Sequence, residues 1–279
     1  MAQLAMLIDV TRCMGCRACQ VACKEWNELR AKTTRNWGSY ENPPDLSPNT
    51  WTRIRFMESG EKGTVPWQFF KEQCLHCTDA PCVKVCPTAA LKNNPLGFVS
   101  FERDLCNGCG YCAEFCPFGV PRMEIINTLT GEAKASKCHL CQDRVTNGYE
   151  PACIWACPAE ALSFGDRETM IAKGQERVAR LQAGASRKFP DANLYGVDVL
   201  GGLGAMYVLP EKPDKYRPAK PNTFGLPANP ESAFTLATAW QSILQPLGEL
   251  VIGAGIVGVA INWIMTRRQV NQQEAQHGD

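Results

Sequence analysis

The chain has 279 residues, which is long enough for a buried hydrophobic core without disulfide support. Its 29 lysines and arginines nearly balance 28 aspartates and glutamates, and a net charge of +1 lacks the basic excess that nucleic-acid binding needs. We therefore expect no nucleic-acid partner. The chain has 16 cysteines beside 3 histidines, far more than packing requires, so the spacing of the cysteines is the main clue to function.

The N-terminal half of the sequence contains two runs of four cysteines. A short strand is predicted over residues 5–10, and a first run with the spacing CxxCxxCxxxC follows it. Residues 24–73 form an insert with four of the seven tryptophans, whose side chains either pack the insert onto the domain or contact a partner. A second run, CxxCxxxxCxxxC, follows the insert. The first run is Cys13, Cys16, Cys19 and Cys23, and the second is Cys74, Cys77, Cys82 and Cys86.

Two further runs follow in the next part of the chain. A strand over residues 97–101 precedes the third run, CxxCxxCxxxC, and the fourth run has eleven residues in its middle gap. A short strand over 162–164 and an amphipathic helix over 169–181 come next. Six prolines between residues 210 and 230 predict an extended spacer. The third run is Cys106, Cys109, Cys112 and Cys116, and the fourth is Cys138, Cys141, Cys153 and Cys157.

Residues 247–265 are apolar on every side and predict one transmembrane helix, with a buried core helix as the alternative. Arg267 and Arg268 follow this segment, whereas residues 228–246 contain no lysine or arginine. By the positive-inside rule the C-terminus is expected in the cytoplasm and the bulk of the chain on the periplasmic side. The N-terminus has no signal-peptide pattern, so we expect export together with a partner that carries the signal.

Three kinds of chemistry compete for the sixteen cysteines. Disulfides between CxxC neighbours close very short loops and stabilise little per bridge. Zinc sites usually draw their ligands from two separated pairs, whereas CxxCxxC places three thiolates on one tight loop. A cuboidal [4Fe–4S] cluster uses that arrangement and takes its fourth ligand from the last cysteine of another run. We therefore interpret the four runs as ligands of four [4Fe–4S] clusters.

Because the fourth cysteine of a run binds the cluster of a partner run, the runs must pair. The second and third runs lie close together and are typical of one compact ferredoxin, which leaves the first and fourth runs to form a second module around it. No catalytic residue is expected, because no nucleophile or acid pair stands out. The predicted ligands are Cys13, Cys16, Cys19 and Cys157 for cluster 1; Cys138, Cys141, Cys153 and Cys23 for cluster 2; Cys74, Cys77, Cys82 and Cys116 for cluster 3; and Cys106, Cys109, Cys112 and Cys86 for cluster 4.

Several longer motifs add a family resemblance that covers essentially the whole chain. The opening LIDVTRCMGCRACQVACKEWN, the insert YENPPDLSPNTW, the third run CNGCGYCAEFCPFGVPR and the single C-terminal span resemble the iron–sulfur (beta) subunit of membrane-bound formate dehydrogenase. That subunit is one of the four-cluster subunits of molybdopterin oxidoreductases. The resemblance implies a subunit that is not an enzyme by itself. It would pass electrons from a molybdopterin or tungstopterin catalytic alpha subunit to a membrane cytochrome b gamma subunit and quinone.

Two alternatives stay open at this point. The chain could be the equivalent subunit of a related molybdopterin oxidoreductase with another substrate, or a free-standing membrane-tethered polyferredoxin. In each case we expect an α+β fold with two nested ferredoxin-like modules, inserts and one C-terminal transmembrane helix. The expected domains are an outer module (1–30 and 130–182, clusters 1 and 2), an inner module (70–125, clusters 3 and 4), a Trp-rich insert (31–69), an extended Pro-rich linker (183–241), the membrane anchor (242–267) and a polar tail (268–279).

Overall fold

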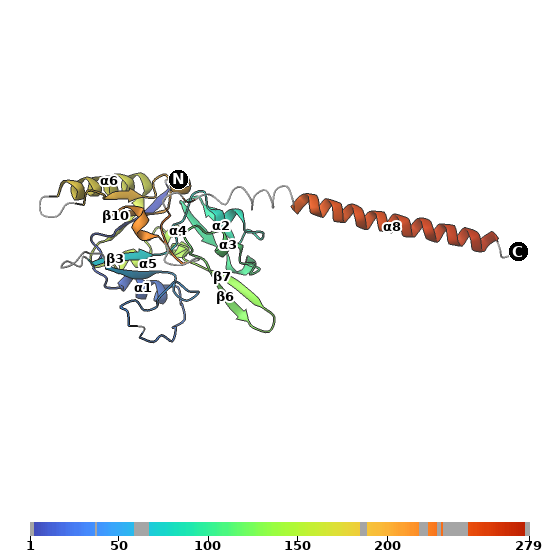
Figure 1. Ribbon diagram of the computed structural model, residues 1–279, viewed down its shortest axis with the longest axis horizontal. Coiled ribbons are helices and arrows are strands. Elements are labelled where there is room, and N and C mark those ends of the chain that lie inside the picture. The colour runs from blue at the N-terminus through green and yellow to red at the C-terminus, as the bar shows by residue number, and fades with distance from the viewer. Residues whose placement is uncertain are drawn as a thin grey trace. The chain divides into compact units, whose positions relative to one another are not determined.

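The computed structural model describes residues 3–36, 38–58, 67–184, 189–217, 223–227, 230 and 245–276 (Figure 1). The chain divides into a large unit, residues 1–232, and a C-terminal unit, residues 233–279. The large unit combines short strands with short helices, as the sequence predicts.

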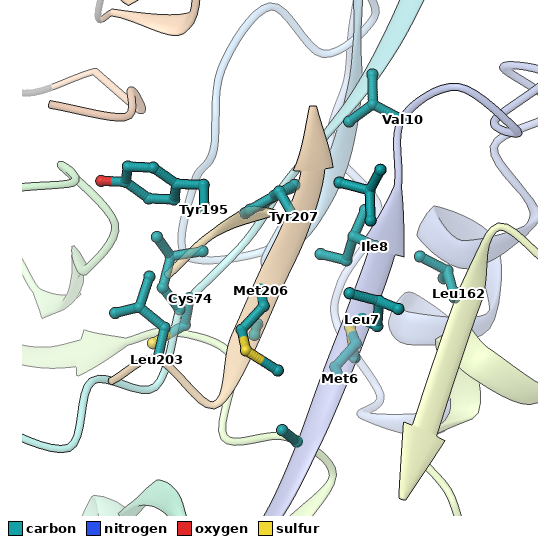
Figure 2. Close-up of a cluster of buried hydrophobic side chains, with 14 of the residues drawn as sticks. Met6, Leu7, Ile8, Val10, Cys74, Leu162, Tyr195, Leu203, Met206 and Tyr207 are labelled. Atoms are coloured by element: carbon teal, nitrogen blue, oxygen red, sulfur yellow. The ribbon is translucent and has the colours of Figure 1, made fainter. Parts of the chain in front are cut away.

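A four-stranded sheet with the order β8-β1-β10-β9 lies at the centre of the large unit. The two middle strands, β1 (Leu4–Asp9) and β10 (Ala205–Leu209), run parallel, with Met6 opposite Ala205. Figure 2 shows their apolar side chains packed together at the core. Both strands are nearly continuous apolar runs because neither face of the sheet is exposed to water at this point. The outer strands, β8 (Leu162–Asp166) and β9 (Asn193–Tyr195), are antiparallel to their neighbours.

Helix α6 (Arg167–Ala183) covers this sheet and matches the helix predicted over 169–181. Asp166 caps its start by accepting hydrogen bonds from the amides of Glu168 (3.1 Å) and Thr169 (3.2 Å), as an N-cap residue does. At Gly174 an added Cβ would lie 2.7 Å from Leu194 Cδ1 on β9. The helix therefore lies closer to the sheet than any larger residue at this position would permit.

Strands β9 and β10 correct the expectation that residues 183–241 form an extended linker. Residues 193–195 and 205–209 belong to the central sheet. The 3₁₀ helix η2 (Val199–Gly201) follows β9, and η3 (Pro213–Tyr216) follows β10. Tyr207 and Tyr216 are completely buried. The physical reason is the apolar run AMYVL, which gains more by burial beside β1 than it would in a solvated spacer.

Three antiparallel hairpins precede the second, third and fourth cysteine runs, whereas the first run follows β1. They are β2 (Arg53–Glu58) with β3 (Trp67–Glu72), β4 (Leu91–Asn94) with β5 (Phe98–Phe101), and β6 (Arg122–Asn127) with β7 (Glu132–Ser136). The predicted strands over 5–10, 97–101 and 162–164 are confirmed as β1, β5 and β8. The β2–β3 hairpin leads directly into the second run, and the β6–β7 hairpin leads into the fourth.

Short helices follow the loops and place cysteines against one another. They are α1 (Ala18–Trp26), α2 (Pro81–Lys84), α3 (Tyr111–Glu114), α4 (Gln142–Thr146) and α5 (Ala152–Trp155), with the 3₁₀ helix η1 (Arg103–Leu105) before the third run. Helix α1 packs against α5, which brings the first run to the fourth, and α2 packs against α3, which brings the second run to the third. Around α2 and α3 lies a small core of its own, with Leu91, Val99 and Phe101 at its centre.

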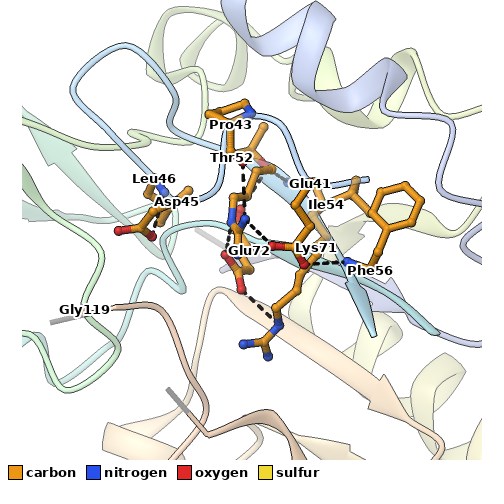
Figure 3. Close-up of polar contacts among 12 residues, drawn as sticks. Glu41, Pro43, Asp45, Leu46, Thr52, Ile54, Phe56, Lys71, Glu72 and Gly119 are labelled. Carbon is orange, nitrogen blue, oxygen red and sulfur yellow. Dashed lines mark hydrogen bonds and ion pairs between the residues drawn. The ribbon is translucent and has the colours of Figure 1, made fainter. Parts of the chain in front are cut away.

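Polar contacts hold the insert together and tie it to the rest of the large unit. Buried Arg53 of β2 pairs with Glu41 (2.9 Å) and with Glu72 of β3. Figure 3 labels both carboxylate residues among the dashed polar contacts. The indole Nε1 of Trp51 donates a hydrogen bond to Ser136 Oγ (2.7 Å) on β7. The contacts of Trp51 favour the packing role of the insert's aromatic residues. Trp37 lies outside the described residues.

Helix α8 (Gln245–Gln276) forms the C-terminal unit. Residues 250–267 have a mean hydropathy of 1.6 and are exposed throughout, so this segment is a candidate membrane span by length and composition. The letters GAGIVG at 253–258 match a dinucleotide-binding pattern, but they lie inside a continuous helix rather than between a strand and a helix. The glycines therefore belong to the apolar segment and not to a nucleotide site.

Candidate metal centres

The loops of the cysteine runs use left-handed backbone to wrap around a central space. Gly108 and Gly110 in the third run have φ of +79° and +80°, and Leu140 in the fourth has φ of 58°. The left-handed Leu140 turns its amide toward Cys138 Sγ, to which it donates over 3.4 Å. The Ala135 amide on strand β7 donates to Cys106 Sγ over 3.3 Å. Such amides stabilise negative charge on sulfur.

Gly108 and Gly110 provide a matched pair for testing the packing of the third run. An alanine Cβ at Gly108 would lie 2.2 Å from the carbonyl oxygen of Ala133, whereas nothing lies within 4 Å at Gly110. Positive φ costs about 1–2 kcal/mol for alanine at either position, and the clash adds about 1–3 kcal/mol at Gly108 only. We expect Gly108→Ala to lower the thermal unfolding midpoint more than Gly110→Ala, measured anaerobically by circular dichroism. Equal losses would contradict the close contact with β7.

Three cysteines of the first run and one of the fourth line a single cavity, here called site 1. They are Cys13, Cys16, Cys19 and Cys157, and the space between them is about 380 Å³. Ile8, Ile54 and Leu162 cover the apolar side of the cavity, and Lys71 lies in its wall. Cys16 is the exposed member of the set.

Site 2 gathers three cysteines of the fourth run with the last one of the first. Cys23, Cys138, Cys141 and Cys153 line a space of about 320 Å³, together with Thr52 and Gln73. The side-chain amide of Asn27 lies 3.8 Å from Cys23 Sγ. None of these four cysteines is exposed.

Sites 3 and 4 are built from the second and third cysteine runs. Cys86, Cys106, Cys109 and Cys112 line a space of about 290 Å³, which is site 4, and Cys109 is exposed. The remaining cysteines, Cys74, Cys77, Cys82 and Cys116, make up site 3 and none is exposed. Burial raises the pKa of Cys77 well above its usual value, and negative charge at Cys74, Cys116 and Cys82 raises it further. The four sulfurs of site 3 are therefore close enough to repel one another as thiolates.

Burial favours the neutral form of the cysteine thiols when no metal is bound. Burial raises the pKa of Cys19, Cys112 and Cys138 to about 12, and that of Cys116 and Cys141 to about 11. Thiols with such pKa values stay protonated at neutral pH unless metal replaces the proton. Metal binding at these sites therefore releases protons.

His76 links site 3 to site 2. It lies between Cys74 and Cys77 and is completely buried, and burial lowers its pKa well below the usual value. Its Nδ1 accepts a hydrogen bond from the Val99 amide (3.3 Å), so the proton of the neutral ring is on Nε2. Nε2 lies 3.7 Å from Cys138 Sγ and can donate to it. His76 thus contacts a cysteine of site 2 as a hydrogen-bond donor and does not replace any of the four cysteines of a site as a ligand.

The cysteine sets fit [4Fe–4S] clusters better than single ions or disulfides. All sixteen cysteines are free thiols. Among the described residues, no group of three or more His, Cys, Asp or Glu side chains converges where one metal ion could bind. The cysteines instead line three separate cavities, each with three cysteines of one run and one cysteine of another. Two loops with three and one thiols around such a space match cuboidal cluster ligation.

Comparisons with known proteins agree with this chemistry. Two family models, each described as a 4Fe-4S dicluster domain, match residues 12–90 and 65–167. Together they cover all four cysteine runs and account for four clusters, because each dicluster domain holds two. Four [4Fe–4S] clusters are therefore the cofactors of this chain.

Curated relatives match nearly the whole chain. The iron–sulfur subunit of nitrate-inducible formate dehydrogenase from Escherichia coli K12 is 38% identical over 99% of this chain and 90% of its own length. The formate dehydrogenase-O iron–sulfur subunit of the same organism is 40% identical over 94% of this chain and 83% of its own. A formate dehydrogenase iron–sulfur subunit of Haemophilus influenzae is 37% identical over 99% and 84%. The chain thus belongs to the family of formate dehydrogenase iron–sulfur subunits, which are electron-transfer subunits rather than catalysts themselves.

Proposed function

We propose that this chain is the electron-transfer subunit of a membrane-bound formate dehydrogenase. It would accept electrons from a molybdopterin or tungstopterin catalytic subunit and pass them to a membrane cytochrome b that reduces quinone. The observation that carries the proposal is the gathering of all sixteen cysteines into four separate four-sulfur sites in a chain with an apolar C-terminal helix. The likeness to formate dehydrogenase subunits over nearly the full length supports formate as the electron source.

The proposed ligand sets follow sites 1 to 4, with clusters numbered in the same way. Each bound cluster supplies one-electron redox chemistry without making or breaking bonds to a substrate. The side chains hold the clusters, screen them from water and set their potentials through hydrogen bonds and charge. The ligands are Cys13, Cys16, Cys19 and Cys157 (cluster 1); Cys138, Cys141, Cys153 and Cys23 (cluster 2); Cys74, Cys77, Cys82 and Cys116 (cluster 3); and Cys106, Cys109, Cys112 and Cys86 (cluster 4). The nested modules, with clusters 1 and 2 in the outer one, are part of the same proposal.

Contacts between neighbouring sites support a linear order from cluster 1 to cluster 4. Lys71 lines site 1, and its hydrogen-bond partners Thr52 and Gln73 line site 2. His76 from the loop of site 3 contacts Cys138 of site 2. The helices that carry Cys82 of site 3 and Cys112 of site 4 pack against each other.

The two ends of this order are the sites with an exposed cysteine, Cys16 and Cys109. Beside site 4, the β6–β7 hairpin exposes Ile125, Ile126 and Leu129. An exposed apolar surface of this kind suits a protein partner. Met14 beside site 1 is exposed as well, so both ends suit a partner. We propose the membrane cytochrome at the site 4 end and the catalytic subunit at the site 1 end.

The orientation in the membrane follows from charge next to the span. Arg267 and Arg268 end the apolar segment, and residues 228–246 contain no lysine or arginine. This asymmetry supports a cytoplasmic C-terminus with the large unit in the periplasm.

Formate itself provides the direct test of the proposed function. The chain is tagged, solubilised gently without oxygen and isolated with its partners, and the broad visible absorbance of the clusters is followed. We expect bleaching by formate, because electrons from the catalytic partner reduce the clusters. Bleaching by dithionite but not by formate, in a preparation that contains an active catalytic subunit, would overturn the formate assignment. Isolation as a single chain would favour the free-standing polyferredoxin.

A further inference from the structure

Lys71 on β3 is a buried cation in the wall between sites 1 and 2. Its side chain lines the cavity of Cys13, Cys16, Cys19 and Cys157, and the residue is 1% exposed. Its ammonium donates hydrogen bonds to Thr52 Oγ1 (2.7 Å) and to Gln73 Oε1. Because Thr52 and Gln73 line site 2, the ammonium lies at the boundary between the two sites.

Within the described part of the chain, no carboxylate forms an ion pair with Lys71. The neighbouring carboxylate on β3, Glu72, which is labelled with Lys71 in Figure 3, already pairs with Arg53 (2.5 Å) and Arg55 (3.2 Å). The hydrogen-bond acceptors of Lys71 are neutral. A buried charge without an opposite charge is strongly unfavourable, so the compensating charge must come from another group.

The cysteines of the two sites supply negative charge to Lys71 once bound clusters hold them as thiolates. Its electrostatic interactions are with Cys19 of site 1 and with Cys153, Cys138 and Cys23 of site 2. A [4Fe–4S] cluster with four thiolates carries about −2 when oxidised and about −3 after it takes up one electron. A nearby fixed positive charge therefore stabilises the reduced form more than the oxidised form, and it does so strongly where water is excluded.

We propose that Lys71 is the shared countercharge of clusters 1 and 2 and raises the reduction potentials of both. The inference rests on the ligand sets proposed above. One ammonium between two clusters shifts both potentials in the same direction, so the electron step between them stays close to balanced. Lys71 is thus a residue that acts through the clusters and touches no substrate.

Lys137, the residue before Cys138, offers a comparison at sites 3 and 4. It is 2% exposed, and its Nζ donates to the carbonyl oxygens of Val99 (3.1 Å) and Cys138 (2.9 Å). Its charge acts on Cys82 of site 3 and Cys112 of site 4. Loss of this charge is expected to move the potentials of clusters 3 and 4 and to leave cluster 1 unchanged.

The test is an anaerobic potentiometric titration of the whole complex, followed by electron paramagnetic resonance, with iron and sulfide counted in every variant. Cluster signals are assigned with Cys16→Ser for cluster 1 and Cys109→Ser for cluster 4. In Lys71→Met we expect reduction of clusters 1 and 2 to become at least tenfold less favourable, which is 59 mV for a one-electron couple. Clusters 3 and 4 are expected to keep their potentials, and Lys71→Arg is expected to restore clusters 1 and 2.

Several outcomes would overturn the proposal. They are four clusters with unchanged potentials in Lys71→Met, or a shift in Lys71→Arg as large as that in Lys71→Met. If Lys71→Met does not retain its iron, Lys71→Gln replaces it with the same readouts. Iron loss in both neutral variants with retention in Lys71→Arg would support a required charge, whereas loss in all three would point to packing and reject the proposal. Failure of the proposed function would appear in the unmodified chain, as fewer than four clusters or no reduction by formate.

Discussion

Replacing Cys109 with serine is expected to remove or convert one cluster and to leave the other three in place. A serine hydroxyl binds iron far less well than a thiolate, and Cys109 is exposed to solvent at site 4. Iron should fall from about sixteen per chain toward about twelve if the cluster is lost. Electron flow from formate to quinone should fall at least about a hundredfold. Even residues that only hydrogen-bond to a metal ligand contribute about 10- to 100-fold to metal affinity or activity. Iron and sulfide analysis, spectroscopy and quinone reduction measure these effects.

The matched control for this substitution is Tyr111→Phe. Tyr111 lies two residues after Cys109 and is 46% exposed, and the change preserves the ring and every cysteine. It should retain all four clusters and full electron flow. Retention of four intact clusters in Cys109→Ser would contradict the ligand set of cluster 4. Full quinone reduction with three clusters would contradict the linear order, because cluster 4 is placed at the exit.

Removing residues 233–279 is expected to release the large unit from the membrane with its clusters still bound. Every described side chain between residues 250 and 267 is exposed, among them Ile256, Val259 and Trp263. Such a surface is unfavourable in water and stable in hydrocarbon. A helix that spans the membrane therefore anchors its chain there effectively irreversibly. The sixteen cysteines all lie in the large unit, which ends before this segment. We expect a change from almost wholly membrane-bound to almost wholly soluble after an alkaline wash.

A shorter truncation separates the span from the tail. Removing only residues 269–279 keeps the apolar segment and both arginines, and this variant should remain in the washed membranes. A chain without residues 233–279 that resists the wash would show that α8 is not the anchor. Protease added to spheroplasts tests the orientation, since the large unit should be digested and the C-terminal tail protected. The reverse pattern would reject a periplasmic large unit.

The sequence was sufficient for the cofactor chemistry and for the local elements next to it. Cysteine spacing reports ligand loops directly in the first and third runs, because three ligands within seven residues must share one loop whatever the rest of the chain does. Strands β1, β5 and β8 and helix α6 also followed from local patterns. The apolar C-terminal helix was predictable for the same reason, since length and composition are local properties of the chain.

Tertiary structure decided what depends on residues far apart in the chain. Strand β10 looked like part of a proline-rich linker, and it is a central strand because β1, nearly two hundred residues earlier, pairs with it in parallel. The unpaired charge of Lys71 was equally invisible, since it arises only where β3 passes between two cysteine sites and Glu72 is taken by arginines. Local patterns specify loops, ligands and helices, whereas long-range pairing and burial specify which of them meet and which charges are left to act on the clusters.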